Sequence, residues 1–388
     1  MKDFNYFAPT EIIFGAGRIR EAGTVTAHYG KRAILVTGGL SFGRRVLYDS
    51  LKKDLEDAGV SCIHFSGVTP NPTTDEVSEG AKMAREEGVD VVVGFGGGSA
   101  MDVAKAIAVE AVHQGTAWDY NCHTKGPTEK TLPIIAIGTT AGTGSQVTPC
   151  AVITKTSDKD KSAIWHKNIF PRAAIVDPEL TLSLPAAVTA QTGFDAFCHN
   201  FEAYLSRNSN PLAECMALDA IRMIVEYLPR VLENGSDLEA RSWMAWADTL
   251  GGLTNASAGV TLPHGLGMQI GGHCPHVTHG QALAVFYPAF TRYTYSFAER
   301  KFAAVGRIFN PSLNSENDAV AARKCCEEID RFLKKIGLWI NFKSLNVGKE
   351  DIREIADCGQ VLGDYANNPR IASIPEMYDL LMSCYDRK

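Results

Sequence analysis

The 388-residue chain has no apolar run of the length that a membrane-spanning helix needs. Its first residues, MKDFNYFAPTEIIFGAG, lack the basic-then-apolar layout of a secretion signal. The formal net charge of -6 is small for this length and gives no argument for binding nucleic acid. We therefore expect neither a membrane nor a nucleic-acid partner.

The cysteines also lack the paired spacing of a disulfide framework. Ten are scattered along the chain, and Cys325 and Cys326 are adjacent. Reduced thiols in a cytoplasmic protein fit this pattern best. The length exceeds what one ordinary core accommodates, so two domains are expected.

The order of apolar runs predicts an α/β first half and a helical second half. Strands are expected at residues 32–39, 60–67, 89–98, 131–138 and 173–180, with helices at 44–59 and 73–88. This alternation predicts a parallel sheet covered on both faces. Helical spacing follows at residues 210–235, 237–259, 298–309 and 319–337. We predict a Rossmann-like α/β domain at 1–183 and a helical domain at 184–388.

A glycine-rich loop, GGGSAMDVAK, follows one of the predicted strands. Glycines 96–98 precede a helix that Ser99 is predicted to cap, with Asp102 as its reciprocal partner. Amide hydrogens at such a helix start can bind phosphate. The spacing does not match G-x-G-x-x-G, and a tight turn without a ligand explains this loop almost as well.

A second loop, GTTAGTGSQ, favours ligand binding. It also follows an apolar strand, and its hydroxyl groups belong to Thr139, Thr140, Thr143 and Ser145. Two such loops at strand carboxyl ends fit ligand binding at the crest of an open parallel sheet.

The first predicted strand ends at Gly38 and Gly39, where dinucleotide enzymes often carry an acid for the ribose 2′-hydroxyl. No acid stands there. Ser41, Arg44 and Arg45 follow, which would tolerate or favour a 2′-phosphate. A solvated helix face explains the two arginines equally well.

Asp195 and His199 are four residues apart in TGFDAFCHNFEAYLS, beside an apolar stripe predicted to face the core, which contains Phe194, Phe197, Cys198, Phe201 and Leu205. On a helix they meet on one face together with Glu202, and both can reach one ion. An isolated pair of this kind is more often a simple hydrogen bond.

Four further candidates for metal ligands gather in one short segment, and they are His264, His273, His276 and His279. One carboxylate and three imidazoles suit Fe²⁺ or Zn²⁺ and leave a position for a substrate oxygen. Spacing alone does not select three histidines from these four.

Four motifs, GGGSAMDVAK, TTAGTGSQVT, GFDAFCHNFEAYLS and HGLGM…THGQALA, occur in the order found in the iron-containing (group III) alcohol dehydrogenase family. The chain resembles that family over nearly its whole length, including the PNPT turn that contains Asn71. The resemblance implies a dinucleotide-binding α/β domain and a helical metal domain of the dehydroquinate synthase-like superfamily. It also implies a homodimer or larger assembly.

The resemblance selects specific residues. It implies the metal ligands Asp195, His199, His264 and His279. It implies that the cofactor NAD(P) is held by Gly97, Gly98, Ser99, Asp102, Thr139, Thr140, Thr143, Ser145 and Lys161, with Asn71 in the PNPT turn. Two departures are Met268, where many relatives carry a second histidine, and Gln146, where many carry glutamate.

The expected activity is reversible hydride transfer between NAD(P)(H) and a small primary alcohol or its aldehyde, at Fe²⁺ or Zn²⁺. A glycerol-type polyol dehydrogenase, a non-redox dehydroquinate synthase-like lyase and a metal-stapled structural protein are the alternatives. Phe194, Trp165 and Cys150 are candidates for lining the substrate pocket, and a place in the core explains each of them at least as well.

Overall fold

The computed structural model describes residues 3–39, 42–121 and 124–387. The chain divides into two compact units. One runs from Phe7 to Ser183, and the other runs from Leu184 to the end and includes the segment up to Tyr6. Each unit is described by itself below.

A six-stranded sheet forms the centre of the first unit. Its strands are β1 (Glu11–Phe14), β2 (Arg32–Gly38), β3 (Ser61–Val68), β4 (Val91–Gly96), β5 (Ile134–Gly138) and β8 (Ala173–Val176). They pair in parallel in the order β1-β8-β5-β4-β2-β3. The predicted parallel sheet is confirmed, with β1 as an additional edge strand.

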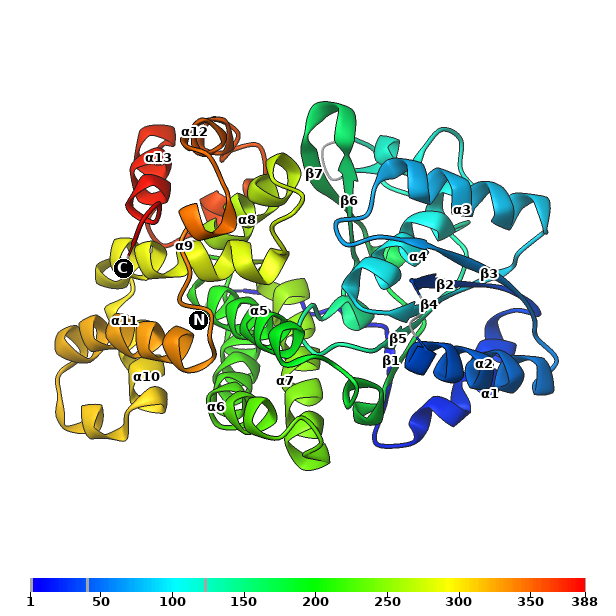
Figure 1. The fold of residues 1–388 in the computed structure, drawn as a ribbon, viewed down its shortest axis with the longest axis horizontal. Helices are drawn as coiled ribbons and strands as arrows, with labels where there is room; N and C mark the ends of the chain where they lie inside the picture. Colours follow the sequence, from blue (N-terminus) through cyan, green and yellow to red (C-terminus); the bar gives the residue numbers. More distant parts are fainter. Residues whose placement is uncertain (1–2, 40–41, 122–123, 388) are drawn as a thin grey trace. The chain divides into compact units, whose positions relative to one another are not determined.

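Helices cover both faces of this sheet (Figure 1). They are α1 (Ala22–Tyr29), α2 (Phe42–Asp57), α3 (Thr74–Glu86) and α4 (Gly98–Glu110). Alternate residues of β2 pack to opposite sides, because Ile34 lies in the core under α3 and α4 while Leu35 lies in the core under α1 and α2. Both side chains are fully buried, which accounts for the unbroken apolar run.

The side on which the chain adds new strands to the sheet reverses beside β2. From β2 the chain passes to β3 on one side, and β4 then pairs with the other side of β2. The carboxyl ends of the strands beside such a switch form the usual ligand crevice of open parallel sheets. Gly38, Gly96 and Gly138 end β2, β4 and β5 at this edge.

An antiparallel hairpin of β6 (Cys150–Lys155) and β7 (Asp160–Trp165) follows β5. No sequence pattern described above predicted this hairpin. Backbone atoms join the hairpin to the turn before α3, where Thr154 N donates to Pro72 O at 2.8 Å.

The second unit is built from helices, as predicted. They are α5 (Ala186–Leu205), α6 (Pro211–Glu233), α7 (Leu238–Ala258), α8 (Leu262–His273), α9 (His279–Thr294), α10 (Glu299–Phe309), α11 (Asp318–Lys335), α12 (Lys349–Asp357) and α13 (Ile374–Ser383). Pro211 stands at the start of α6 behind Asn210, whose side chain accepts from Ala213 N, so the predicted helix start is confirmed.

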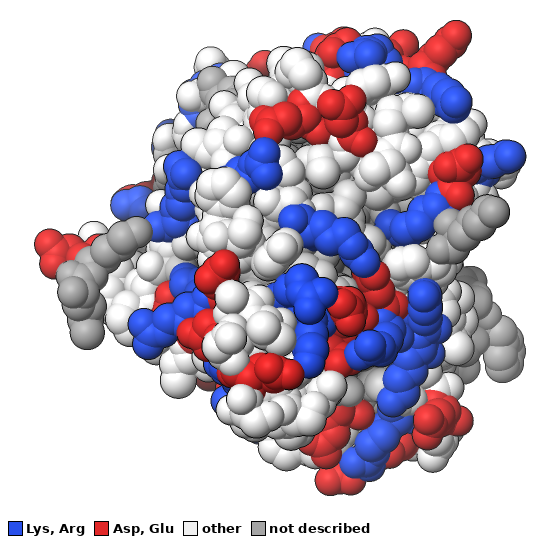
Figure 2. All heavy atoms as spheres, turned by 90° about the vertical axis from the view of Figure 1, so that its left-hand side faces the viewer, with Lys and Arg blue, Asp and Glu red and all other residues white. Residues whose placement is uncertain are grey.

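Surface charge on this unit is mixed. Figure 2 shows acidic and basic side chains interspersed over the face in view. Several pair with each other, as Arg307 does with Asp318 at 2.8 Å and Lys324 with Glu316 at 2.8 Å. None of the helices in the described ranges is long and apolar enough to cross a membrane.

Candidate metal centre and cofactor loops

Helix α5 presents two adjoining stripes. The first is aromatic, and Phe194, Phe197 and Phe201 are fully buried there. Phe194 stacks on Phe197 with ring centroids 5.8 Å apart, and each packs against Tyr287 of α9. This packing fixes the rotation of α5 and therefore the direction of the neighbouring polar stripe.

The polar stripe of α5 is buried as well. Asp195, His199 and Glu202 are exposed by 4%, 6% and 0%. Buried polar groups in such a position need a compensating partner. Two histidines from other helices face Asp195, one from the first turn of α8 and one from the first residue of α9.

The oxygen Oδ1 of Asp195 is the point where these side chains converge. It lies 3.4 Å from His264 Nε2, 3.6 Å from His199 Nδ1 and 3.8 Å from His279 Nε2. Asp195 Oδ1 and His264 Nε2 are both buried and without a hydrogen-bond partner. Asp195, His199 and His264 each offer one ligand atom, all within 4.8 Å of one another. A buried cluster of ligand atoms, in which Asp195 Oδ1 and His264 Nε2 have no hydrogen-bond partner, fits a divalent metal ion.

The electrostatics of the cluster favour a cation. Burial alone would raise the pKa of Asp195, but the imidazoles of His199, His279 and His264 outweigh it and lower the pKa to about 2. Burial would lower the pKa of His264, yet the carboxylates of Glu202 and Asp195 raise it to about 10. Both shifts have one cause, the mutual attraction between the buried carboxylates and positive charge at this cluster.

Two carboxyl groups beside the cluster were not predicted as site residues. Glu202 accepts from His264 Nδ1 at 2.8 Å. Asp364, in a turn that contacts α8, has a pKa that burial raises to about 6 against the opposing effect of His264. The helical spacing that places Glu202 on the same stripe as Asp195 could have identified it as a site residue. No sequence pattern pointed to Asp364.

The other two histidines of the segment turn elsewhere. His273 Nδ1 lies 3.0 Å from Gln269 O within its own helix. His276 is exposed, and its Nε2 lies 2.9 Å from Leu345 O. The structure therefore brings together the four predicted ligands and leaves these two outside the cluster.

In the first unit, the two glycine-rich loops lie side by side at the carboxyl ends of β4 and β5. Thr139 N donates to Gly96 O at 2.8 Å. A Cβ on Gly98 would come within 2.7 Å of Thr143 Cγ2, so only glycine allows the loops to approach this closely. Thr140 Oγ1 is buried without a hydrogen-bond partner. The first-turn amides of α4 and this hydroxyl suit an anionic ligand such as a pyrophosphate.

The predicted capping of α4 is wrong. Gly97 is the N-cap, and it offers no side-chain cap, so Ser99 already lies inside the first turn. Asp102 is then too far along the helix to return to the cap. Its carboxylate instead accepts from Ser145 Oγ at 2.7 Å and from Val152 N at 3.2 Å.

Lys105 of α4, which was not among the predicted site residues, links this helix to the second loop. Its side chain is fully buried, and Nζ donates to Ser145 O and Oγ at 2.7 Å and to Cys150 O at 2.6 Å. Asp102 Oδ1 lies 3.8 Å away. Burial lowers the pKa of Lys105 and raises that of Asp102. The Ser145 hydroxyl is thus committed to this internal network.

Two other predicted cofactor residues meet each other. Lys161 Nζ on β7 donates to Asn71 Oδ1 at 2.7 Å, across 90 positions of sequence. Asn71 has a left-handed backbone with φ of 56°. This conformation is uncommon outside glycine, although asparagine tolerates it.

At the end of β2, Gly39 has open space around it, because a Cβ there would meet no heavy atom within 4 Å. Arg45 lies on α2 with its side chain 68% exposed, 3.9 Å from Asp49. This exposed pair matches the solvated-face interpretation. Ser41 and the side chain of Arg44 lie outside the described residues.

The three pocket candidates differ in burial. Phe194 belongs to the aromatic core of α5, which contradicts a role in lining a pocket. Trp165 is 40% exposed on β7, and Cys150 is half-buried on β6.

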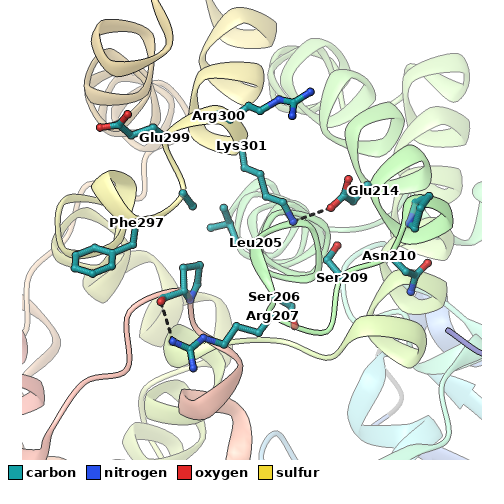
Figure 3. Close-up of a pocket in the computed structure, with 13 residues that line it drawn as sticks. Leu205, Ser206, Arg207, Ser209, Asn210, Glu214, Phe297, Glu299, Arg300 and Lys301 are labelled. Atoms are coloured by element: carbon teal, nitrogen blue, oxygen red, sulfur yellow. Dashed lines mark hydrogen bonds and ion pairs between the residues drawn. The ribbon is translucent and has the colours of Figure 1, made fainter. Parts of the chain in front are cut away.

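A separate cavity of about 700 Å³ opens near the carboxyl end of α5 (Figure 3). Lys301 there pairs with Glu214 at 2.7 Å, and Arg207 donates to Pro369 O at 3.1 Å. These charged groups are already satisfied, and none of the four predicted ligands lines the cavity.

Two family models together match most of the chain. Residues 9–178 match iron-containing alcohol dehydrogenase, and residues 189–385 match the C-terminal part of the Fe-containing alcohol dehydrogenase family. A similar protein is the NAD-dependent methanol dehydrogenase of Bacillus methanolicus, 32% identical over 378 residues, which are 97% of this chain and 98% of that protein. Another is the 1,3-propanediol dehydrogenase of Klebsiella pneumoniae, 35% identical over 369 residues, 95% of each chain.

Solved structures of alcohol dehydrogenases have the same fold as this chain. An archaeal halo-thermophilic alcohol dehydrogenase from a Red Sea brine pool superposes with a TM-score of 0.94 at 35% identity, covering 99% of this chain and 100% of the other. A 1,3-propanediol oxidoreductase gives a TM-score of 0.92 at 33% identity, with the same coverage.

Proposed function

The chain belongs to the iron-containing alcohol dehydrogenase family, and from that premise we propose that Asp195 and the three imidazoles around its Oδ1 hold the metal ion. It is a metal-dependent, NAD-linked alcohol oxidoreductase. The comparisons do not favour the lyase or glycerol-type alternatives. The observation that carries the ligand assignment is the pair of buried, unpartnered atoms Asp195 Oδ1 and His264 Nε2.

When bound, the metal supplies Lewis acidity toward an alcohol oxygen, and the nicotinamide supplies hydride exchange. The chain's own residues orient the metal ligands and shield them from water on one side. The aromatic stripe of α5 excludes water behind the ligands and fixes their direction. A dry, prearranged set of donors needs little reorganisation during the reaction.

The cofactor assignment is supported by the loops after β4 and β5. Gly98 lets the first turn of α4 stay close to Thr143, and Thr140 Oγ1 has no partner of its own. Asp102 and Ser145 contribute indirectly in this proposal, because both are bonded within the network around Lys105. The bond between Asn71 and Lys161 positions an amide and an ammonium group for the ribose.

We propose a small primary alcohol or its aldehyde as the substrate. This proposal is supported by two similar proteins, a methanol dehydrogenase and a 1,3-propanediol dehydrogenase. A panel of short aldehydes, polar and apolar, assayed with NADH and NADPH after anaerobic loading with Fe²⁺ or Zn²⁺, tests this proposal. Absence of turnover with every pair of metal and coenzyme would contradict it.

We propose a cytoplasmic homo-oligomer. The described cysteines are all free, in keeping with a reducing compartment. β1 is an edge strand with β8 as its neighbour, and Phe7 close to it is 61% exposed. Exposed edges and aromatic side chains favour association. Light scattering after size-exclusion chromatography measures the assembly, and a monomer at micromolar concentration would contradict it.

A further inference from the structure

Glu202 on α5 is a buried carboxylate whose hydrogen bonds go to the start of α8. It follows His199 by three residues on α5 and is fully buried. Its Oε1 accepts from His264 Nδ1 at 2.8 Å. Its Oε2 accepts from the backbone N–H of Thr261 at 2.9 Å and from the Thr261 hydroxyl at 3.2 Å.

These contacts determine the tautomer of His264. A carboxylate that receives only donors has no proton to give, so Nδ1 of the imidazole must carry the hydrogen. In the neutral ring that metal binding requires, the lone pair then lies on Nε2. That is the atom that faces Asp195 Oδ1 and has no hydrogen-bond partner.

The same carboxylate also holds the start of α8. Thr261 is the N-cap but makes no side-chain cap of its own. Glu202 Oε2 receives the Thr261 N–H and lies 3.4 Å from the N–H of His264. A residue of α5 thus takes up amides that the helix itself leaves unsatisfied. Glu202 therefore holds both the backbone and the ring of His264 in place relative to α5, the helix that carries Asp195.

We propose that Glu202 is a positioning residue for the metal, fixing the tautomer and orientation of His264; this inference rests on the ligand set proposed above. Glu202 and Asp195, both buried, also contribute two formal negative charges to the site. A divalent ion with neutral imidazoles balances them, whereas buried uncompensated charge is costly. Partners of this kind orient metal-bound histidines in general.

Glu202→Gln tests the proposal because it keeps the shape of the side chain and removes the charge. The amide oxygen can accept from only one of the two groups. The NH₂ group would then face another donor, either the N–H of the imidazole or the N–H groups at the start of α8. We expect metal affinity to fall by about 10–100-fold. The measurement is titration of chelator-stripped full-length protein with Co²⁺ and Zn²⁺ against a competing chelator. The visible ligand-field bands of the Co²⁺ form should also shift.

Thr261→Val is the matched control for a purely structural role. It removes one hydrogen bond to Glu202 and leaves the His264 contact, so it should lower the unfolding midpoint while the metal dissociation constant stays within about twofold of wild type. Glu202→Asp retracts the carboxylate by one methylene and decides the question if the glutamine variant does not fold. Wild-type affinity and an unchanged Co²⁺ spectrum in either Glu202 variant would overturn the proposal. Failure of the wild-type protein to bind metal would instead refute the proposed function.

Discussion

Replacing Lys105 by methionine removes one fully buried ammonium group from a largely buried hydrogen-bond network. Lys105 is fully buried and donates to Ser145 and to Cys150 O. Methionine is similar in length and apolar, so the packing of α4 is largely preserved. The loss is therefore mainly electrostatic and concentrated on Asp102, which keeps its place beside Ser145.

The loss in free energy of unfolding can be estimated from the buried groups that Lys105 leaves without a partner. Removing one partner of a buried ion pair costs about 3–5 kcal/mol, because the other charge stays buried. Carbonyl oxygens left without a donor add about 1 kcal/mol each. Burial already raises the pKa of Asp102, so uptake of a proton limits the total. We expect the free energy of unfolding to fall by about 4 kcal/mol, which is about 2 M in urea midpoint at a slope of about 2 kcal/mol per M.

Urea unfolding followed by far-ultraviolet circular dichroism measures this change. Lys82→Met is the matched control, because Lys82 is 68% exposed and pairs with Glu86 at 3.9 Å on a helix surface. It should alter stability by no more than about 0.5 kcal/mol. Adding Asp102→Asn to the Lys105 variant should recover part of the loss. A Lys105 variant within about 1 kcal/mol of the Lys82 control would refute the reasoning.

Three further predictions concern separate parts of the chain. Asp195→Ala should abolish turnover and lower the metal content by elemental analysis, while NADH fluorescence titration still detects binding; normal activity would contradict the ligand assignment. Gly39→Asp meets no steric obstacle and should lower kcat/KM with NADPH relative to NADH, and an unchanged ratio would count against the interpretation of that turn. Bonds from Ser373 N and Oγ hold the pKa of Glu376 at about 2, below its usual 4.5. Its contribution to stability is therefore present above pH 4.5 and lost as the pH falls toward 2, so the difference in thermal midpoint between wild type and Glu376→Gln should shrink over that window; a difference independent of pH would contradict it.

The sequence pattern alone predicted those features of the fold that depend on residues close together in the chain. The apolar stripe of α5 predicted the buried positions of Phe194, Phe197 and Phe201 because helical spacing alone determines which residues share a face. The parallel sheet followed from continuous apolar runs ending in glycines. For His264 and His279, spacing supplied candidates, and only the resemblance to a family selected them.

Other features depend on contacts that spacing does not encode. Lys105 reads as an ordinary helical lysine until the hairpin strand β6 brings Cys150 O to it. The contact between Lys161 and Asn71 spans 90 positions. The helix start at Gly97 was missed because Ser99 is the better capping residue by type, yet the close approach of Gly98 to Thr143 determines where the turn lies. In each case tertiary packing overrides a local preference.

The aromatic packing of α5 has a consequence for maturation of the protein in the cell. Phe194, Phe197 and Phe201 are held by packing against other aromatic rings, and the ligand stripe follows them because it shares the same helix. We therefore expect newly made chains to fold before any ion arrives. A cell short of iron would then accumulate a folded reserve that becomes competent as soon as the metal is supplied.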